Sequence, residues 1–138
     1  MKKALITGSS SGIGFEYAKY LNQKGWSLDL VSHNEERSKK AREFFQDNNN
    51  NYHLLDLSKK DSIAELLGKI DTPDLIVANA GITLMSKAGE SSSLQRDELY
   101  YLLCGGVIDL IGISSKIKKE RCFKDCHYFK YRSSNTDA

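Results

Sequence analysis

The sequence has little of several features that would mark a specialised class of protein. Its 138 residues include one proline and three cysteines, and the formal net charge is only +2. Three cysteines without a secretory context predict reduced thiols, not a disulfide framework, and favour the cytoplasm. Because basic and acidic residues are interleaved along the chain, the small net charge also argues against a nucleic-acid partner.

Long hydrophobic runs are missing as well. The apolar run after the basic start Met1–Lys3 ends at Ile6, which is too short for a secretory signal peptide. No other stretch approaches the roughly 20 apolar residues of a transmembrane helix, so we expect no membrane partner. The composition, 40% hydrophobic and 28% charged, is typical of a soluble domain, and the length suffices for one core.

Short apolar runs alternate with helical patterns through most of the chain. This alternation predicts parallel strand–helix–strand units with right-handed crossovers, which is an α/β fold. The expected strands cover residues 3–7, 27–31, 52–55 and 74–78. The expected helices cover residues 12–24, 34–47, 58–69 and about 94–121, and we expect a loop over 48–51.

Helix starts and inner faces can also be predicted. Ser32 or Asn34 is expected to cap the second helix and Ser58 the third, because their side chains can accept from free N–H groups. For the first, second and last of these helices, the helical spacing predicts which residues face the core. In turn, these residues are Ile13, Tyr17, Ala18 and Leu21; Ala41, Phe44 and Phe45; and Leu99, Leu102, Leu103, Gly106, Leu110, Ile113 and Ile117.

A glycine-rich turn joins the first strand to the first helix, in the stretch ALITGSSSGIG from Ala4 to Gly14. Phosphates bind at such junctions, because glycine lets the backbone come close and the helix N-terminus offers unpaired N–H groups. The glycines are Gly8, Gly12 and Gly14, a GxxxGxG spacing that differs from the more common GxGxxG.

Two further elements stand at the carboxyl ends of strands. Asp56-Leu57 follows the third strand, and Asn79-Ala80-Gly81 follows the fourth. Ligands of open α/β sheets bind outside these strand ends. The three elements together therefore predict one dinucleotide-binding site.

On these residues the sequence resembles the classical short-chain dehydrogenase/reductase family, over roughly residues 1–120. The resemblance implies a truncated Rossmann fold with a parallel sheet of order 3-2-1-4. It also implies a cofactor-binding domain over residues 1–121 and a separate tail over 122–138. The implied cofactor-binding residues are Gly8, Ser10, Ser11, Gly12, Ile13, Gly14, His33, Asp56, Leu57, Asn79, Ala80 and Gly81.

The resemblance gives these residues roles. Gly8 permits the turn, Gly12 lets the backbone approach a pyrophosphate, and Gly14 lets helix and strand pack closely. Asp56 can accept from the adenine amino group, and Asn79 can tie neighbouring strand ends together. The hydroxyl groups of the turn serines can contact phosphate or ribose, and a glycine after the fourth strand leaves room for ribose.

Cofactor choice depends on the residues after the second strand. NAD enzymes of the family usually place a carboxylate there, but this chain has Ser32 and then His33. The missing acid removes repulsion of a 2′-phosphate, and a protonated histidine attracts it. We therefore favour NADP(H) as cofactor, with NAD(H) as the alternative.

Members of the family carry their catalytic residues in the second half of the chain, and we find no convincing match to them in this sequence. Leu103 stands where the family has its relay Asn, and neither Tyr20–Lys24 nor the series Ser114, Ser115, Tyr128 and Arg132 forms a convincing catalytic set. Cys122, Cys126 and His127 lack a fourth metal ligand, so we expect no metal site.

The prediction is an oxidoreductase that moves a hydride between NADP(H) and a small carbonyl or alcohol, catalytically incomplete as this polypeptide. The alternative is a non-catalytic dinucleotide-binding module or an inactive fragment. Self-association is expected, through the helix over 94–121 and the open edge of the fourth strand.

Overall fold

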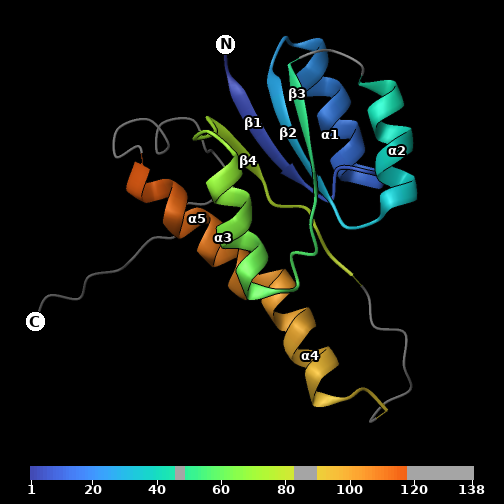
Figure 1. Cartoon of the computed structure of the whole chain (residues 1–138), viewed down its shortest axis with the longest axis vertical. Helices are drawn as coiled ribbons and strands as arrows, with labels where there is room; N and C mark the ends of the chain where they lie inside the picture. The colour runs from blue at the N-terminus through green and yellow to red at the C-terminus, as the bar shows by residue number, and fades with distance from the viewer. Residues whose placement is uncertain (46–48, 83–89, 118–138) are drawn as a thin grey trace, which may run out of the picture.

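A computed structural model gives the fold, and it describes residues 1–45, 49–82 and 90–117. Strands and helices alternate as the sequence predicts, and the last helix is interrupted by a π-helical turn, η1 (Figure 1). The elements are β1 (Lys3–Thr7), α1 (Gly12–Gln23), β2 (Ser27–Ser32), α2 (Glu35–Phe44), β3 (Asn50–Leu54), α3 (Lys60–Lys69), β4 (Leu75–Val77), α4 (Ser93–Tyr100), η1 (Tyr101–Gly105) and α5 (Gly106–Ile117).

The four strands form one parallel sheet in the order β3-β2-β1-β4, which confirms the predicted order. The central strand β1 places Leu5 between Asp29 of β2 and Ile76 of β4. Because all strands are parallel, their carboxyl ends lie along one edge of the sheet. Within the described residues, β4 pairs only with β1, so its outer edge is open.

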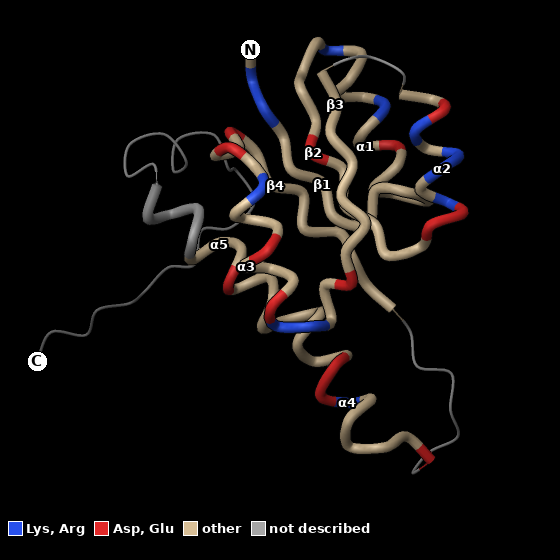
Figure 2. Tube along the Cα trace, viewed as in Figure 1, with Lys and Arg blue, Asp and Glu red and all other residues tan. Residues whose placement is uncertain are grey.

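Helices cover both faces of the sheet, and this explains the unbroken apolar run from Ala4 to Ile6 in β1 and the buried apolar residues on either side of Asp29 in β2. Ala4 and Ile6 pack on one side in a cluster with Ala18 of α1, whereas Leu5 packs on the other side with Ile63 of α3. Charged side chains are left to the outer surfaces, where Lys and Arg alternate with Asp and Glu along α2 (Figure 2).

The inner faces of α1 and α2 differ from the prediction. In α1 the buried residues are Gly14, Ala18 and Leu21, whereas the predicted Ile13 and Tyr17 are 70% and 50% exposed. Small residues at this interface let α1 lie close to the sheet, which turns the bulkier side chains outward. Ala41 of α2 and Phe45, which directly follows this helix, are buried as predicted, but Phe44 is 56% exposed and packs its ring against Phe15 and Phe45.

The expected loop over 48–51 was wrong for its last two residues, because β3 begins at Asn50. The Asn50 side chain accepts from the backbone N–H of Leu28 and donates to Asn22, and Asn51 donates to the buried carboxylate of Asp29. These side-chain bonds stabilise a polar edge strand that its composition alone does not indicate. His53 of the same strand contacts the same carboxylate of Asp29 at 2.9 Å.

One of the predicted caps is correct and the other is wrong. Asn34 caps α2, since its Oδ1 accepts from the N–H of Arg37 at 2.8 Å. Ser58 does not cap α3, whose first residue follows Lys59 and has no side-chain cap. The Ser58 hydroxyl donates instead to Asp56.

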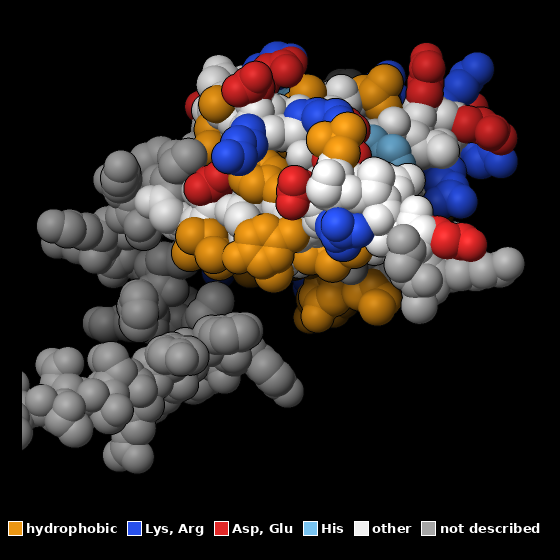
Figure 3. Space-filling view, turned by 90° about the horizontal axis from the view of Figure 1, so that it is seen from below, with side chains coloured by type: hydrophobic (Ala, Val, Ile, Leu, Met, Phe, Trp, Pro, Cys, Tyr) orange, Lys and Arg blue, Asp and Glu red, His pale blue; other side chains and the backbone are white. Residues whose placement is uncertain are grey.

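The predicted long helix consists of α4, η1 and α5 in succession. Leu102, Gly106 and Leu110 of the predicted stripe are buried, but Leu103 is 48% exposed, a correction that follows from the wider π turn. Hydrophobic groups remain on the surface among charged ones (Figure 3).

No helix in the described part of the chain is long and apolar enough to cross a membrane. Residues 118–121 of the predicted helix and the tail over 122–138 lie outside the described residues.

Candidate functional site

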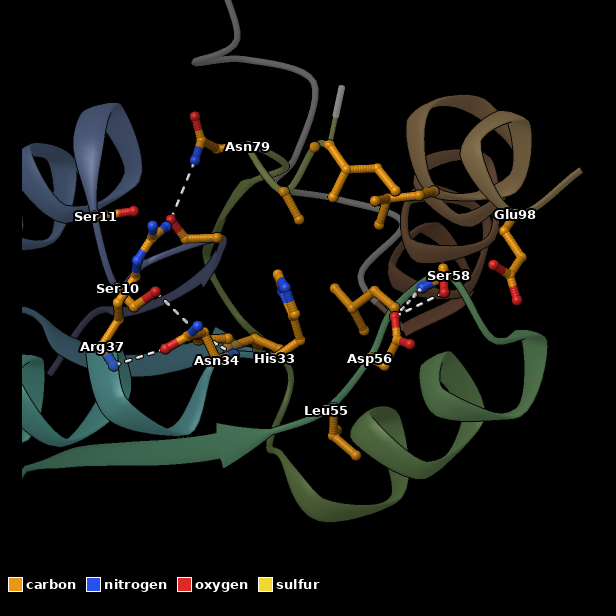
Figure 4. A pocket seen from close by; sticks show the side chains of 18 residues that line it. Ser10, Ser11, His33, Asn34, Arg37, Leu55, Asp56, Ser58, Asn79 and Glu98 are labelled. Atoms are coloured by element: carbon orange, nitrogen blue, oxygen red, sulfur yellow. Dashed lines mark hydrogen bonds between the residues drawn. The ribbon is translucent and has the colours of Figure 1, made fainter. Parts of the chain in front are cut away.

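A pocket of about 400 Å³ lies at the carboxyl ends of the strands. It is lined by the loops that follow β1, β2, β3 and β4, together with residues of α4 and η1 (Figure 4). Most of the predicted site residues meet there. They are Gly8, Ser10, Ser11, His33, Asp56, Leu57, Asn79, Ala80 and Gly81.

The glycine turn after β1 needs glycine at two positions. Gly8 and Gly12 have φ angles of +65° and +59°, which side chains with a Cβ rarely adopt. A Cβ on Gly8 would lie 2.9 Å from the Cα of Ala80, so this residue also lets two loops touch. A Cβ on Gly12 would meet nothing within 4 Å, so the backbone there is open to an approaching ligand.

Gly14 has a different role, because it lies buried where α1 crosses the turn. A Cβ there would be 2.4 Å from the carbonyl oxygen of Gly8 and 2.6 Å from Nδ2 of Asn79. The predicted close packing of helix and strand is therefore confirmed for this residue. Gly14 does not line the pocket, and Gly12 and Ile13 line a separate shallow hollow with Tyr17 and Tyr20.

Asn79 and Thr7 join the ends of β1 and β4. The Asn79 amide donates to the carbonyl oxygens of Thr7 and Gly8, at 3.4 and 3.3 Å. The backbone N–H groups of Asn79 and Ala80 both donate to Oγ1 of Thr7, at 3.0 Å each. Sequence reasoning predicted the role of Asn79 but missed Thr7, although its place directly before Gly8 was a signal.

Short polar side chains connect the glycine turn to the end of β2. The Ser32 hydroxyl donates to Oγ of Ser10 at 2.8 Å, and the backbone N–H of Asn34 donates to Oγ of Ser32 at 3.3 Å. Ser11 stands at the N-cap position of α1, but its side chain makes no capping bond. Its exposed hydroxyl is thus available to a ligand at the helix N-terminus.

Asp56 forms a tight turn after β3. Its Oδ1 accepts from the N–H of Ser58 at 3.0 Å and from the Ser58 hydroxyl at 2.7 Å. Burial alone would raise the pKa of Asp56, but these two bonds and the nearby charge of Lys59 outweigh it and lower the pKa. Asp56 is therefore a charged acceptor at neutral pH, with Oδ1 already engaged.

The two ends of the pocket differ in character. Figure 4 shows Ser10, Ser11 and Arg37 on one side and Asp56, Ser58 and Glu98 on the other. Glu98 of α4 forms an ion pair with Lys59, which precedes α3. Around Gly81 the described lining is apolar, with Ile82 and Leu102, and a Cβ on Gly81 would lie 3.3 Å from Leu103.

The rejected catalytic candidates lie away from the pocket or outside the residues that the structure describes. Neither Tyr20 nor Lys24 lines the pocket, and the Lys24 ammonium lies 5.6 Å from the Tyr20 ring centre. Ser114 and Ser115 belong to α5, in agreement with their predicted helical position. Tyr128 and Arg132, and the cysteine–histidine group Cys122, Cys126 and His127, lie outside the described residues.

Arg37 is one of the pocket residues that sequence reasoning missed, together with Leu55, Ile82 and Glu98. It lies in the first turn of α2, exposed, and lines the pocket with His33 and Asn34. In the sequence it is one charge in a helix rich in charges, and such runs usually form a solvated face. Only the fold brings it next to the glycine turn.

Comparison with known proteins agrees with this geometry. The model of the short chain dehydrogenase family matches residues 2–116. The chain belongs to the short chain dehydrogenase family. A curated relative, the 3-oxoacyl-acyl-carrier-protein reductase FabG of Rickettsia prowazekii, is 37% identical over 82 residues, which are 59% of this chain and 34% of the relative.

Solved short chain dehydrogenase structures share the fold. A 4-hydroxyisoleucine dehydrogenase in complex with NADH superposes with a TM-score of 0.76 at 20% identity, over 85% of this chain and 49% of that one. A short-chain dehydrogenase from Sphingobium yanoikuyae in complex with NADPH gives 0.74 at 22% identity, over 85% and 48%. This chain thus spans about half of these structures and about a third of the Rickettsia relative.

Proposed function

We propose that this chain binds a nicotinamide dinucleotide, NADP(H) in preference to NAD(H), as the cofactor-binding part of a short chain oxidoreductase. The family reaction is hydride transfer between the cofactor and a small carbonyl or alcohol, and the cofactor supplies the hydride when bound. One observation carries the proposal. The glycine turn, Asp56 and Asn79-Ala80-Gly81 come from separate strands and line a single pocket at the carboxyl edge of the sheet.

The residues of the pocket and of the glycine turn beside it fit such a ligand. The open space beside Gly12 and the free N-terminus of the 12-residue helix α1 suit a pyrophosphate. The hydroxyls of Ser10 and Ser11 lie at the same turn and can donate to phosphate or ribose oxygens. The free carboxylate oxygen of Asp56 can accept from the adenine amino group.

The preference for NADP(H) rests on the end of β2. Ser32 occupies the place of the usual acid, and residues 32–34 contain no carboxylate that would repel a 2′-phosphate. His33 lines the pocket and adds positive charge when protonated. Solved relatives with NADH and with NADPH both share the fold, so the choice depends on side chains of this kind.

We further propose that this polypeptide binds the cofactor without efficient turnover. The described residues that line the Gly81 end, Ile82 and Leu102, can neither give nor take a proton. Leu103 holds the position at which the family resemblance expects an Asn. The alternative to an oxidoreductase is therefore a non-catalytic dinucleotide-binding module, and this apolar lining favours it.

Calorimetric titration of the chain with NADPH and with NADH tests binding. Oxidation of NADPH in the presence of a panel of carbonyl compounds tests turnover. Gly12→Asp places a charge at the proposed pyrophosphate and is expected to abolish binding. Gly25→Asp is the matched control, because Gly25 is exposed, also has a positive φ, of +75°, leaves open space for an added Cβ and does not line the pocket. Turnover lost in Gly12→Asp alone supports the enzyme, binding without turnover supports the module, and no binding contradicts both.

A further inference from the structure

We propose that one side of α1 and the outer edge of β4 form a docking surface for a separate polypeptide that contributes a strand and an amphipathic helix. The partner is the half of a short chain dehydrogenase that this chain does not span. The inference goes beyond the proposed function, because it concerns another surface and rests on the fold and the family, not on the cofactor.

One side of α1 carries three large apolar side chains that are at least half exposed. Ile13, Tyr17 and Tyr20 are 70%, 50% and 57% exposed, and together with Gly12 and Glu16 they line a shallow hollow. Their spacing of four and three residues places them next to one another on the helix surface. We call these three residues the α1 flank.

The α1 flank lies on the β4 side of its helix. Phe15 and Lys19 of α1 contact Phe44 of α2, and Tyr17 lies two residues from each of them, which is about 200° round the helix. The flank is therefore turned away from α2. Since α1 packs on β1 and β2, and α2 packs on β3, the side away from α2 is the side of β4, the strand beyond β1 (Figure 1).

β4 continues this apolar surface. Leu75 and Val77 are only half-buried and pack on the same cluster as Ala18 of α1, so they lie on the face of the sheet that α1 covers. Within the described residues, no strand pairs with the outer edge of β4. An unpaired edge beside an apolar face is suited to a polypeptide that adds a strand.

The α1 flank can be covered without burying an unpaired charge. Glu16 is the charged residue among those that line the hollow, and it already pairs with Lys19 of the same helix. An apolar helix face can therefore lie on the flank without the desolvation cost of an isolated carboxylate.

A second copy of this chain does not fit both parts of the surface. Strands lie about 4.8 Å apart, so pairing of β4 with its copy would hold the two α1 helices roughly 19 Å apart over the sheet. Packed helices lie about 8 to 10 Å apart, so each flank would stay open. One strand added to β4 gives a width of about 10 Å, which is the width of a single helix beside α1.

The half of the family that this chain does not span has the required size and architecture. The FabG of Chlamydia trachomatis is 33% identical over 121 residues, which are 78% of this chain and 49% of that relative. Its other half is thus about as long as the matched part. A parallel sheet is extended by strands that are joined through crossover helices, so such a half can supply a strand and a helix together.

Sedimentation velocity and calorimetry test the docking surface, on the full chain mixed with the unmatched half of the Chlamydia trachomatis FabG. A complex of one chain with one such half is expected. Tyr20→Asp is expected to weaken it at least about tenfold, because a buried tyrosine becomes a buried charge. Tyr100→Asp is the matched control, since Tyr100 is 68% exposed at the end of α4, outside this surface and the pocket lining. It is expected to change the affinity less than about threefold.

A linked protein tests the same contact without depending on a high affinity. With the two polypeptides joined by a flexible linker, Tyr20→Asp is expected to lower the melting temperature by about 5 °C or more. In the chain alone Tyr20 is 57% exposed, so the same substitution is expected to change the melting temperature by less than about 2 °C.

Three results would overturn the inference. The first is a mixture without a complex together with a linked protein whose melting does not respond to Tyr20→Asp. The second is equal weakening by Tyr20→Asp and Tyr100→Asp, which would assign the contact to another surface. The third is loss of association of the chain with itself in Tyr20→Asp, which would make a second copy the occupant. Failure of the proposed function is distinguishable, because the chain would then form the complex and bind neither NADPH nor NADH.

Discussion

Replacing Gly14 by alanine tests the packing that holds the glycine turn in place. The added Cβ would lie 2.4 Å from the carbonyl oxygen of Gly8 and 2.6 Å from Nδ2 of Asn79. Real Cβ atoms do not come this close to other atoms, so α1 must move away from the turn or the Asn79 amide must leave its position. Either movement disturbs the two bonds that Asn79 donates to the end of β1.

The expected loss of stability follows from three contributions. Overpacking at a closed site costs about 1 to 3 kcal/mol, and each weakened neutral hydrogen bond costs about 1 kcal/mol. Alanine regains up to about 1 kcal/mol over glycine as a helix former. The net destabilisation is about 2 to 4 kcal/mol, which for a chain of this size lowers the melting temperature by roughly 8 to 16 °C.

Thermal unfolding followed by circular dichroism measures the effect. Gly68→Ala is the matched control, because Gly68 lies inside α3 with nothing within 4 Å of an added Cβ. Alanine there is expected to raise the melting temperature slightly, through helix propensity alone. A Gly14→Ala protein that melts within about 2 °C of wild type would refute the proposed packing.

Three further results are expected. Because hydrogen bonds from Ser58 help to lower the pKa of Asp56, the stability they add is present at neutral pH and is lost as the pH falls through that pKa. Ser58→Ala should therefore raise the pKa of Asp56 in an NMR titration, and an unchanged titration would contradict this. Burial and the bond to Asp109 raise the pKa of Tyr101 from 10.0 to about 12, so stability should decline as the pH rises through this interval, and Tyr101→Phe should remove that decline in pH-dependent melting. Since the described part of the chain leaves β4 with one open edge, sedimentation velocity should show association that grows with concentration, and a monodisperse monomer would count against it.

The fold could be predicted because its strongest signals are local. The unbroken apolar run in β1 follows from burial on both sides of the sheet, and the confirmed strand order follows from the family resemblance. The errors have a different cause. Asn50 and Asn51 belong to a strand because partners far along the chain, Leu28 and Asp29, satisfy their side chains. Such long-range bonds leave no trace in local composition.

The helix faces show the same limit. The spacing of Ile13, Tyr17 and Leu21 fits one helical face, but the face that packs consists of Gly14, Ala18 and Leu21. A hydrophobic pattern favours large side chains, whereas close packing at the glycine turn requires small ones. A glycine whose added Cβ would meet Gly8 and Asn79 thus decides the orientation of α1.

The π turn connects the fold to the limits of the site. The Tyr101 ring lies so close to Gly105 that an added Cβ would be 2.8 Å from its Cδ2, so this turn needs a small residue there. A π turn widens the helix by one residue and shifts the face that follows. Leu102 consequently lines the pocket, whereas Leu103 is half exposed although regular spacing predicts it to be buried. The resemblance places the relay position at Leu103, so the residue that a catalytic relay would require is apolar and lies outside the pocket lining. The glycine turn and the end of β2 do not depend on this helix for their hydrogen bonds, and cofactor binding can therefore be retained where the relay is missing.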